Sequence, residues 1–214
     1  MALDDTSFAR IKKLVTDYHA KIGDVRNDDN LSATGQRRAL AKLHVTYRDE
    51  IKGIRDNANA AYQDRKGYLM GEVFGVHGAT NPAEIMAMRD AMTRVADIAT
   101  PDQARRLFQQ AHLTGDEYMR RAIAAHAFSQ RSGGPFGGAW EQVFTDYAGT
   151  QDERRQGHIA ELDQLHQADS KRARFQEQIL CGISRPTELD GYGDIDSVAT
   201  GTTDLGIETE GDAA

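Results

Sequence analysis

Two stretches of the chain repeat their apolar residues every three or four positions, and this spacing constrains the fold more than any other feature. The first run covers residues 8–25 and the second covers residues 40–68. Alternating steps of three and four place apolar side chains on one stripe of an α-helix and are typical of a coiled-coil seam. Polar residues 27–30 separate the runs. The sequence therefore predicts two long helices that pair as an antiparallel coiled-coil hairpin over residues 1–75.

We interpret the seam positions as residues through which the chain contacts a second copy or a protein partner. In the hairpin these are Phe8, Ile11, Val15, Tyr18, Ile22, Leu40, Tyr47, Ile51 and Ile54. His44 also falls on the second seam, where a polar residue helps to fix the register of a coiled coil. An aromatic stripe later in the chain supplies three more predicted interaction residues, Trp140, Phe144 and Tyr147.

Helix-start signals follow the hairpin. Asn81-Pro82 and Thr100-Pro101 each place a capping side chain before a proline at the first helical position, and Thr114 with Glu117 has the spacing of a capping box. These signals predict a small unit of short helices over residues 81–130.

The glycine-rich residues 132–138 predict a joint, after which residues 139–180 hold a short aromatic helix and a long charged helix. No segment alternates apolar and polar residues as a half-buried strand does. The predicted fold class is all-α.

The formal net charge of −7 is concentrated in one segment. Residues 181–214 carry a single basic residue, Arg185, against eight acidic ones, so residues 1–180 sum to zero. The apolar residues of this segment are isolated and glycines recur. Such a segment buries too little surface to offset the roughly 1–2 kcal/mol per residue that backbone ordering costs. The sequence predicts a disordered acidic tail over residues 181–214.

The residue types that carry chemistry do not converge along the sequence. Glu161 and His166 are five positions apart, which does not match the i,i+3 or i,i+4 spacing of metal ligands on one helix face. Residues 132–138 follow a predicted helix, whereas a phosphate-binding loop follows a strand. The single cysteine, Cys181, excludes a disulfide within the chain. We predict a protein that is not an enzyme, with no catalytic, cofactor-binding or metal-binding residues.

Two other function classes stay open. Arginine pairs such as Arg105-Arg106 and Arg120-Arg121 would suit a regulatory adaptor or a DNA-associated protein, although acidic residues match them and no single basic stripe forms. His112 and His126 would support a hydrolase or a metal enzyme if the turn at residues 114–115 brought them together.

Three segments resemble a known group of proteins: Met1 to Val15 (MALDDTSFARIKKLV), Leu31-Ser32 leading to Tyr47-Arg48-Asp49, and Leu113 to Glu117 (LTGDE). They are similar to uncharacterised helical proteins in the structural gene clusters of tailed actinobacterial phages and prophages. The resemblance covers most of residues 1–180 and implies a scaffold-like role in virion assembly or a minor structural role, with no catalytic residues. Phage scaffolds usually end in a basic helical element, whereas this chain ends in acidic residues.

Partners and location follow from these observations. We expect protein partners, either virion components or a second copy of the chain, and we disfavour nucleic acid. The chain has no run of about 18 apolar residues that would cross a membrane. Its first residues lack the charged and apolar regions of a signal peptide. We therefore expect it in the cytoplasm of the host bacterium or associated with the virion, with no membrane partner.

Overall fold

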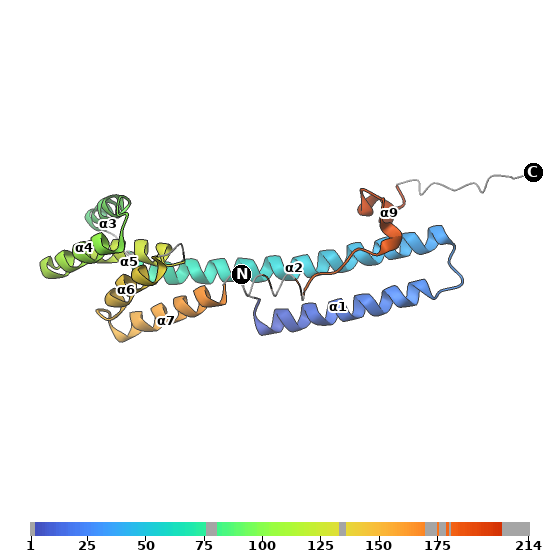
Figure 1. Cartoon of the computed structure of the whole chain (residues 1–214), viewed down its shortest axis with the longest axis horizontal. Coiled ribbons are helices and arrows are strands. Elements are labelled where there is room, and N and C mark those ends of the chain that lie inside the picture. The colour runs from blue at the N-terminus through green and yellow to red at the C-terminus, as the bar shows by residue number, and fades with distance from the viewer. Residues whose placement is uncertain are drawn as a thin grey trace, which may run out of the picture. The chain divides into compact units, whose positions relative to one another are not determined.

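The computed structural model of the chain describes residues 3–75, 81–132, 136–169, 175, 179 and 181–202, and every regular element in them is helical (Figure 1). The elements are α1 (Asp5–Arg26), α2 (Ala33–Phe74), α3 (Pro82–Val95), α4 (Pro101–Thr114), α5 (Glu117–Gln130), α6 (Gly137–Ala148), α7 (Glu153–Ala168), the 3-10 helix η1 (Thr187–Leu189) and α9 (Ile195–Thr200). The predicted all-α class is confirmed. None of the helices formed by these residues has the length and hydropathy of a membrane span.

The chain forms two compact units. Unit 1 combines Met1–Tyr62 with Ala168–Ala214, and unit 2 is the continuous stretch Gln63–Gln167. Helix α2 contributes residues to both units. These units group the chain differently from the predicted domains 1–75, 81–130, 139–180 and 181–214.

Side-chain caps start several helices, two of them where the sequence predicts them. The Ser7 N–H donates to the Asp4 carboxylate at 2.7 Å and starts α1. Asn81 accepts from the Ala83 N–H at the start of α3, and Thr100 accepts from the Gln103 N–H at the start of α4. A cap of this kind stabilises a helix by about 1 kcal/mol, because it satisfies a backbone N–H that has no partner within the helix.

The predicted capping box at Thr114 is wrong. Thr114 is the last residue of α4, and its hydroxyl donates to the Gln110 carbonyl at 3.1 Å. Gly115, with φ of 72°, then ends α4 in the left-handed conformation. The next residue, Asp116, caps α5 by accepting from the Met119 N–H at 3.0 Å. The start signal for α5 therefore lies two positions later than the spacing suggested, because a glycine stop precedes it.

In unit 1, α1 and the first part of α2 run antiparallel and side by side (Figure 1). Arg10 pairs with Glu50 at 3.1 Å, and the hydroxyl of Tyr18 lies 2.9 Å from Nδ1 of His44. Further along, Gln36 donates to the carbonyl of Val25 at 3.2 Å. Residue numbers therefore rise on one helix as they fall on the other. The coiled-coil character of this pair stays a prediction.

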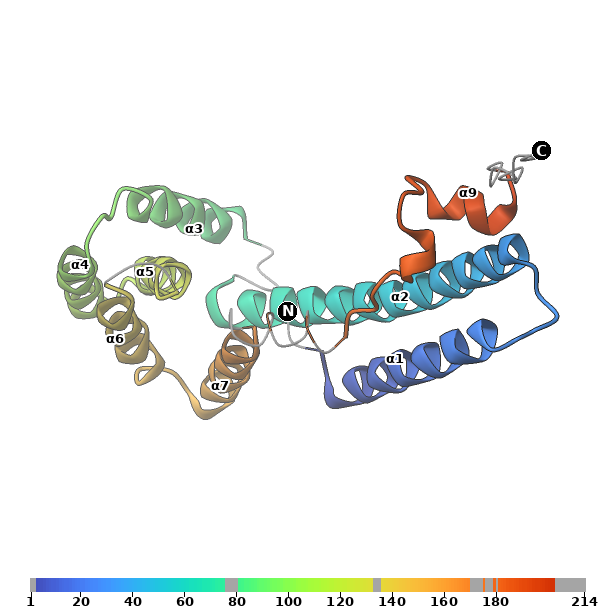
Figure 2. The same cartoon turned by 45° about the vertical axis from the view of Figure 1, so that its right-hand side comes forward.

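The predicted disordered tail is wrong for residues 181–202, which we call the C-terminal strap. The strap contains η1 and α9, and Figure 2 shows α9 beside α2. Its isolated apolar residues Cys181, Leu189 and Val198 are each 0% exposed and pack against the two hairpin helices. They need no helical periodicity, because each one fills a separate position on a surface that other elements have already built. Residues 203–214 lie outside the described residues.

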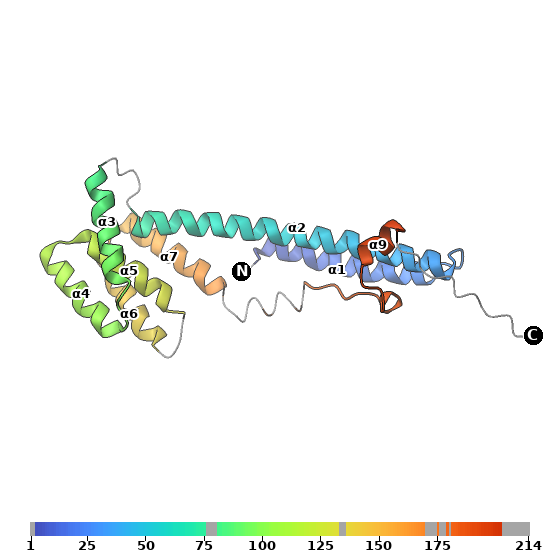
Figure 3. The same cartoon turned by 90° about the horizontal axis from the view of Figure 1, so that it is seen from above.

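Unit 2 gathers α3 to α7 around the C-terminal end of α2 (Figure 3). Its core draws apolar side chains from all six helices, including Val73 of α2, Phe108 of α4 and Leu162 of α7. The last long helix was predicted to reach residue 180. Helix α7 ends at Ala168, and residues 170–174, 176–178 and 180 lie outside the described residues.

Candidate functional site

The predicted interaction residues of the hairpin lie mainly in the interior of unit 1. Seven of the nine are buried, with at most 8% of each residue exposed: Ile11, Tyr18, Ile22, Leu40, Tyr47, Ile51 and Ile54. The other two, Phe8 and Val15, are half-buried and pack against the cluster that contains Ile11 and Cys181. The seam residues thus pack against other residues of the same chain. Binding of a partner through them stays a prediction.

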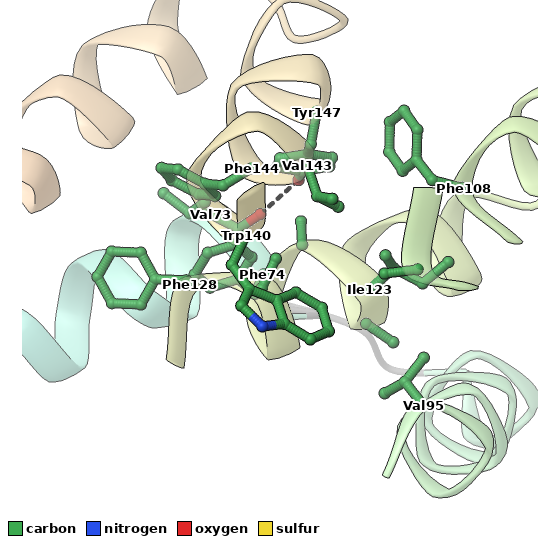
Figure 4. Close-up of a cluster of buried hydrophobic side chains, with 14 of the residues drawn as sticks. Val73, Phe74, Val95, Phe108, Ile123, Phe128, Trp140, Val143, Phe144 and Tyr147 are labelled. Atoms are coloured by element: carbon green, nitrogen blue, oxygen red, sulfur yellow. Dashed lines mark hydrogen bonds between the residues drawn. The ribbon is translucent and has the colours of Figure 1, made fainter. Parts of the chain in front are cut away.

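The aromatic stripe of α6 lies in the core of unit 2 (Figure 4). Trp140 is 5% exposed, Phe144 1% and Tyr147 0%. The Tyr147 hydroxyl donates to the Val73 carbonyl at 2.8 Å, the hydrogen bond drawn in Figure 4. Burial raises the pKa of Tyr147 to about 12. These three side chains pack between the helices of unit 2. They are buried and form no exposed surface to which a partner could bind.

A buried polar network joins the hairpin to the strap in unit 1. The Tyr18 hydroxyl lies 2.9 Å from the Ser184 carbonyl and 2.9 Å from Nδ1 of His44. Because a carbonyl can only accept, Tyr18 donates to Ser184, and His44 must carry its hydrogen on Nδ1. Burial lowers the pKa of His44 and raises that of Tyr18 to about 12. Both side chains are therefore neutral near pH 7.

Two arginine–carboxylate pairs connect the strap to the hairpin. Arg26 of α1 donates to both oxygens of Glu188, at 2.6 and 2.9 Å. Arg48 of α2 does the same with Asp196, at 2.9 and 2.8 Å. Such bidentate pairs fix the orientation of the strap on the hairpin and also contribute binding energy. The hydrogen bonds from Arg26 lower the pKa of Glu188 to about 2.

Two of the acidic residues predicted to lie in a tail, Glu188 and Asp196, thus pair with arginines of the same chain. The sequence contains one indication of this pairing, because its two ends carry opposite net charges. Residues 1–75 have a small basic excess, whereas residues 181–214 are strongly acidic.

The two histidines considered for a hydrolase or metal site have separate partners in unit 2. Nε2 of His126 lies 3.0 Å from the Ile98 carbonyl, and its ring meets the ring of Trp140 edge to face. Nδ1 of His112 lies 3.3 Å from a nitrogen of Arg120. In the part of the chain that the structure describes, no group of three or more His, Cys, Asp or Glu residues is arranged to hold a metal ion.

A serine–histidine contact that the sequence did not reveal lies just after α5. Oγ of Ser132 is 2.7 Å from Nε2 of His166. Burial, and then the charge of Arg131, lower the pKa of His166, so the imidazole is neutral near pH 7 and can accept the hydroxyl hydrogen. A serine nucleophile also needs a group that orients the imidazole. Asp163, which stands three positions before His166 on α7, instead pairs with Arg131.

Arg131 is the most enclosed charged side chain of this region, with 4% of its side chain exposed. Its guanidinium lies 4.0 Å from the ring centre of Phe128 and 4.9 Å from that of Phe144. Stacking on these rings attracts the cation without hydrogen bonds. Nε and Nη2 of Arg131 are buried and make no hydrogen bond. Arg131 thus acts as a structural anchor between α5, α6 and α7.

Several arginines proposed for DNA contacts are paired with acids inside unit 2. Glu117 accepts from Arg120 and from Arg121. A third arginine, Arg155, lies 3.8 Å from the same carboxylate. Arg121 also donates to the backbone carbonyl of Gly75 at 3.1 Å. These side chains make contacts within the unit and are mostly covered, with 17% of the Arg120 and Arg121 side chains and 26% of the Arg155 side chain exposed.

A groove lined largely by apolar surface lies between α4 and α6 in unit 2. It encloses about 490 Å³ and is lined by Phe108, Gln109, His112, Leu113, Asp146 and Thr150. Leu113 is 87% exposed at its edge. We call this feature the α4–α6 groove. Its sequence signal is weak, because Leu113 is a single apolar residue away from the buried face of α4, two positions after the buried Ala111 and just before the Gly115 stop.

Comparison with known proteins adds no family to this description. No protein-family model matches the chain, and we find no curated protein and no solved structure with significant similarity to it.

Proposed function

We propose that this chain is a non-enzymatic helical assembly protein that acts through protein–protein contacts, as a scaffold-like or minor structural component of a tailed-phage virion. The α4–α6 groove carries the proposal, because it combines an apolar recess with the highly exposed Leu113. An apolar groove with a large apolar side chain at its edge has the form that takes up the apolar face of an amphipathic helix. The class of partner, virion proteins in the cytoplasm of the host bacterium, comes from the resemblance of the sequence to phage structural proteins.

The proposal moves the contact surface from the seams to the groove. The seam residues of the hairpin and the aromatic stripe of α6 are used inside their own units. Within the hairpin, we propose that α1 and α2 pair as a coiled coil. The alternating spacing of three and four supports this, together with the register set by Arg10 with Glu50 and Tyr18 with His44.

The test is co-expression of the chain with the virion proteins encoded beside its gene. We expect one of them to co-purify in stoichiometric amount with the wild-type chain, and Leu113→Glu to reduce its recovery at least tenfold. The matched control is Met86→Glu, which introduces the same charge at a 69% exposed side chain of α3 that does not line the groove. Equal recovery with both variants, or no virion protein recovered with the wild type, would contradict the proposal.

The same material tests the alternative of a DNA-associated protein. Phosphate contacts make binding fall steeply with salt, so such a protein would shift duplex DNA at low salt and release it near physiological salt. Arg120, Arg121 and Arg155 contact Glu117 and have largely covered side chains, so we expect no shift through them. A salt-sensitive shift that the wild-type chain shows without any virion partner would favour the alternative.

A further inference from the structure

We propose that the hairpin face covered by the C-terminal strap is a docking site that also accepts the strap of a second copy of this chain, so that chains join by exchanging straps. The proposal concerns unit 1 and goes beyond the proposed function, which rests on the α4–α6 groove of unit 2. It is carried by the pairing of Arg26 with Glu188 and Arg48 with Asp196, around the contact of Tyr18 with Ser184.

The receptor face has hairpin contacts that do not involve the strap. Gln36 donates to the carbonyls of Val25 and Arg26 at the end of α1, and Arg10 pairs with Glu50. These contacts hold α1 against α2, so the arginines of the face stand on elements that other interactions position. A site presented on packed helices loses little freedom when a ligand arrives.

The strap is itself held by local contacts. The Arg185 guanidinium donates to the carbonyls of Leu189 and Tyr192, which folds the strap back around η1. Asp194 caps α9 by accepting from the N–H groups of Asp196 and Ser197, at 3.1 and 3.3 Å. These contacts lie within the strap, so they are the same whichever chain supplies the hairpin face.

The two surfaces match in both charge and apolar contacts. Glu188 and Asp196 of the strap each pair with an arginine of a different helix, Arg26 of α1 and Arg48 of α2. The strap is therefore fixed at two points in one orientation. Leu189 and Val198 are 0% exposed and pack in the same cluster as Leu40 and Tyr47. This combination selects a segment with acidic and apolar residues at the spacing of the strap. A second copy of the chain carries that segment.

Nothing in these contacts requires the strap and the hairpin to belong to one chain. The paired residues stand 148 to 166 positions apart, and the intervening Gln63–Gln167 forms a unit with its own core. Docking within one chain is favoured only by the effective concentration of the strap that belongs to the same chain. Exchange therefore wins where the internal contact is weakened or where copies are crowded, as in an assembly.

Reciprocal charge reversal in the full chain tests this. One variant reverses the face (Arg26→Glu with Arg48→Glu) and the other reverses the strap (Glu188→Arg with Asp196→Arg). Each variant alone places like charges at both contacts and should be a monomer with an undocked strap. When the two are mixed, every hairpin can meet a strap of opposite charge on the other variant. We expect a 1:1 dimer by sedimentation.

Cys181 reports docking in the same samples, because it is the single cysteine, lies at the start of the strap and is 0% exposed. We expect thiol labelling to be at least tenfold faster in each variant alone than in the wild type, and to slow again in the mixture. The control is the fourfold variant, which restores opposite charges within one chain and should be a monomer with a protected thiol. A mixture that stays monomeric with a reactive thiol overturns the proposal, and so does a protected thiol in either variant alone.

A second measurement does not depend on the mixture. A labelled peptide of residues 181–202 is titrated into the full-length strap-reversed variant, and the same peptide with Glu188→Arg and Asp196→Arg serves as the control. We expect saturable binding of the first peptide and none of the second. Equal binding of both would overturn the proposal. Peptide binding without a dimer in the mixture would assign the face to the strap of its own chain alone and would also overturn exchange.

Discussion

The two units of the molecule are closed in different ways. Unit 2 is one continuous stretch in which α3 to α6 pack mainly on helices one or two elements away, around the aromatic side chains of α6. Unit 1 needs the strap to cover Tyr18 and Leu40 of the hairpin, and it uses paired charges as well as apolar contacts to hold it. Local packing gives a stable core, whereas closure by a distant segment gives a contact that can open while both parts keep their helices.

Each unit has an intrinsic reporter, so the comparison can be measured. Trp140, the single tryptophan, is buried in unit 2, and Cys181, the single cysteine, is buried in unit 1. Tryptophan fluorescence therefore follows the unfolding of unit 2, and the rate of thiol labelling follows the opening of the strap.

The largest effect is expected from truncating the core of unit 2. Phe144 is 1% exposed and meets the rings of Phe74 and Phe128, so Phe144→Ala leaves a cavity. We expect the free energy of unfolding of unit 2 to fall by about 3–5 kcal/mol, measured by Trp140 fluorescence in urea. The control Phe136→Ala, at a side chain that is 64% exposed, should change it by less than about 0.5 kcal/mol. Equal losses in the two variants would contradict this picture of the core.

The next effect concerns the polar network of unit 1. Tyr18→Phe removes one hydroxyl and leaves both the Ser184 carbonyl and the Nδ1 hydrogen of His44 without this partner. Unpaired buried groups of this kind cost about 1–3 kcal/mol each. We expect Cys181 labelling to accelerate about tenfold or more while Trp140 fluorescence reports unchanged unit 2. Tyr68→Phe, at a side chain that is 43% exposed, is the control. An unchanged labelling rate in Tyr18→Phe would show that the network does not hold the strap.

A smaller effect follows the protonation of Glu188. Its pKa is lowered from 4.5 to about 2 by the hydrogen bonds from Arg26, so the folded state binds the proton less readily than the unfolded state. The stabilisation is complete above pH 4.5 and is lost as the pH falls toward 2. We expect about 1 kcal/mol, the upper end for a pair that is partly exposed to solvent.

The measurement is Cys181 labelling by a reagent whose reactivity is corrected for pH, compared between the wild type and Glu188→Gln. The wild type should open more readily as the pH falls below 4.5, and Glu188→Gln should lose much of that dependence. Two identical pH profiles would mean that Arg26 and Glu188 contribute nothing to strap docking.

The sequence predicted well those features that depend on neighbouring residues. The apolar spacing placed α1 and α2, and the caps Asn81 and Thr100 placed the starts of α3 and α4. The strap escaped prediction because its order depends on partners more than 140 positions away, such as Ser184 on Tyr18. A local window around Leu189 or Val198 contains no trace of the surface that buries them.

For the candidate site too, the sequence predicted what depends on local spacing and missed what depends on packing between helices. Periodicity identified residues that are buried, among them Tyr18 and Tyr147, but it does not say whether the covering surface belongs to the same chain. Leu113 was not among the predicted interaction residues, because an apolar residue at the edge of a helix face becomes exposed or covered only through the packing of α4 on α6.

The smallest effects compare one glycine in each unit and have opposite signs. Gly23 lies inside α1 with no atom within 4 Å of an added Cβ, so Gly23→Ala should stabilise unit 1 by about 0.5–1 kcal/mol through helix propensity. Gly115, with φ of 72°, ends α4, so Gly115→Ala should destabilise unit 2 by about 1 kcal/mol even though the space around it is open. Slower Cys181 labelling in the first variant and a lower urea midpoint of Trp140 fluorescence in the second are the expected readouts. If each variant also moved the reporter of the other unit by the same free energy, the units would unfold together, and the contrast between local packing and closure by the strap would not describe their stability.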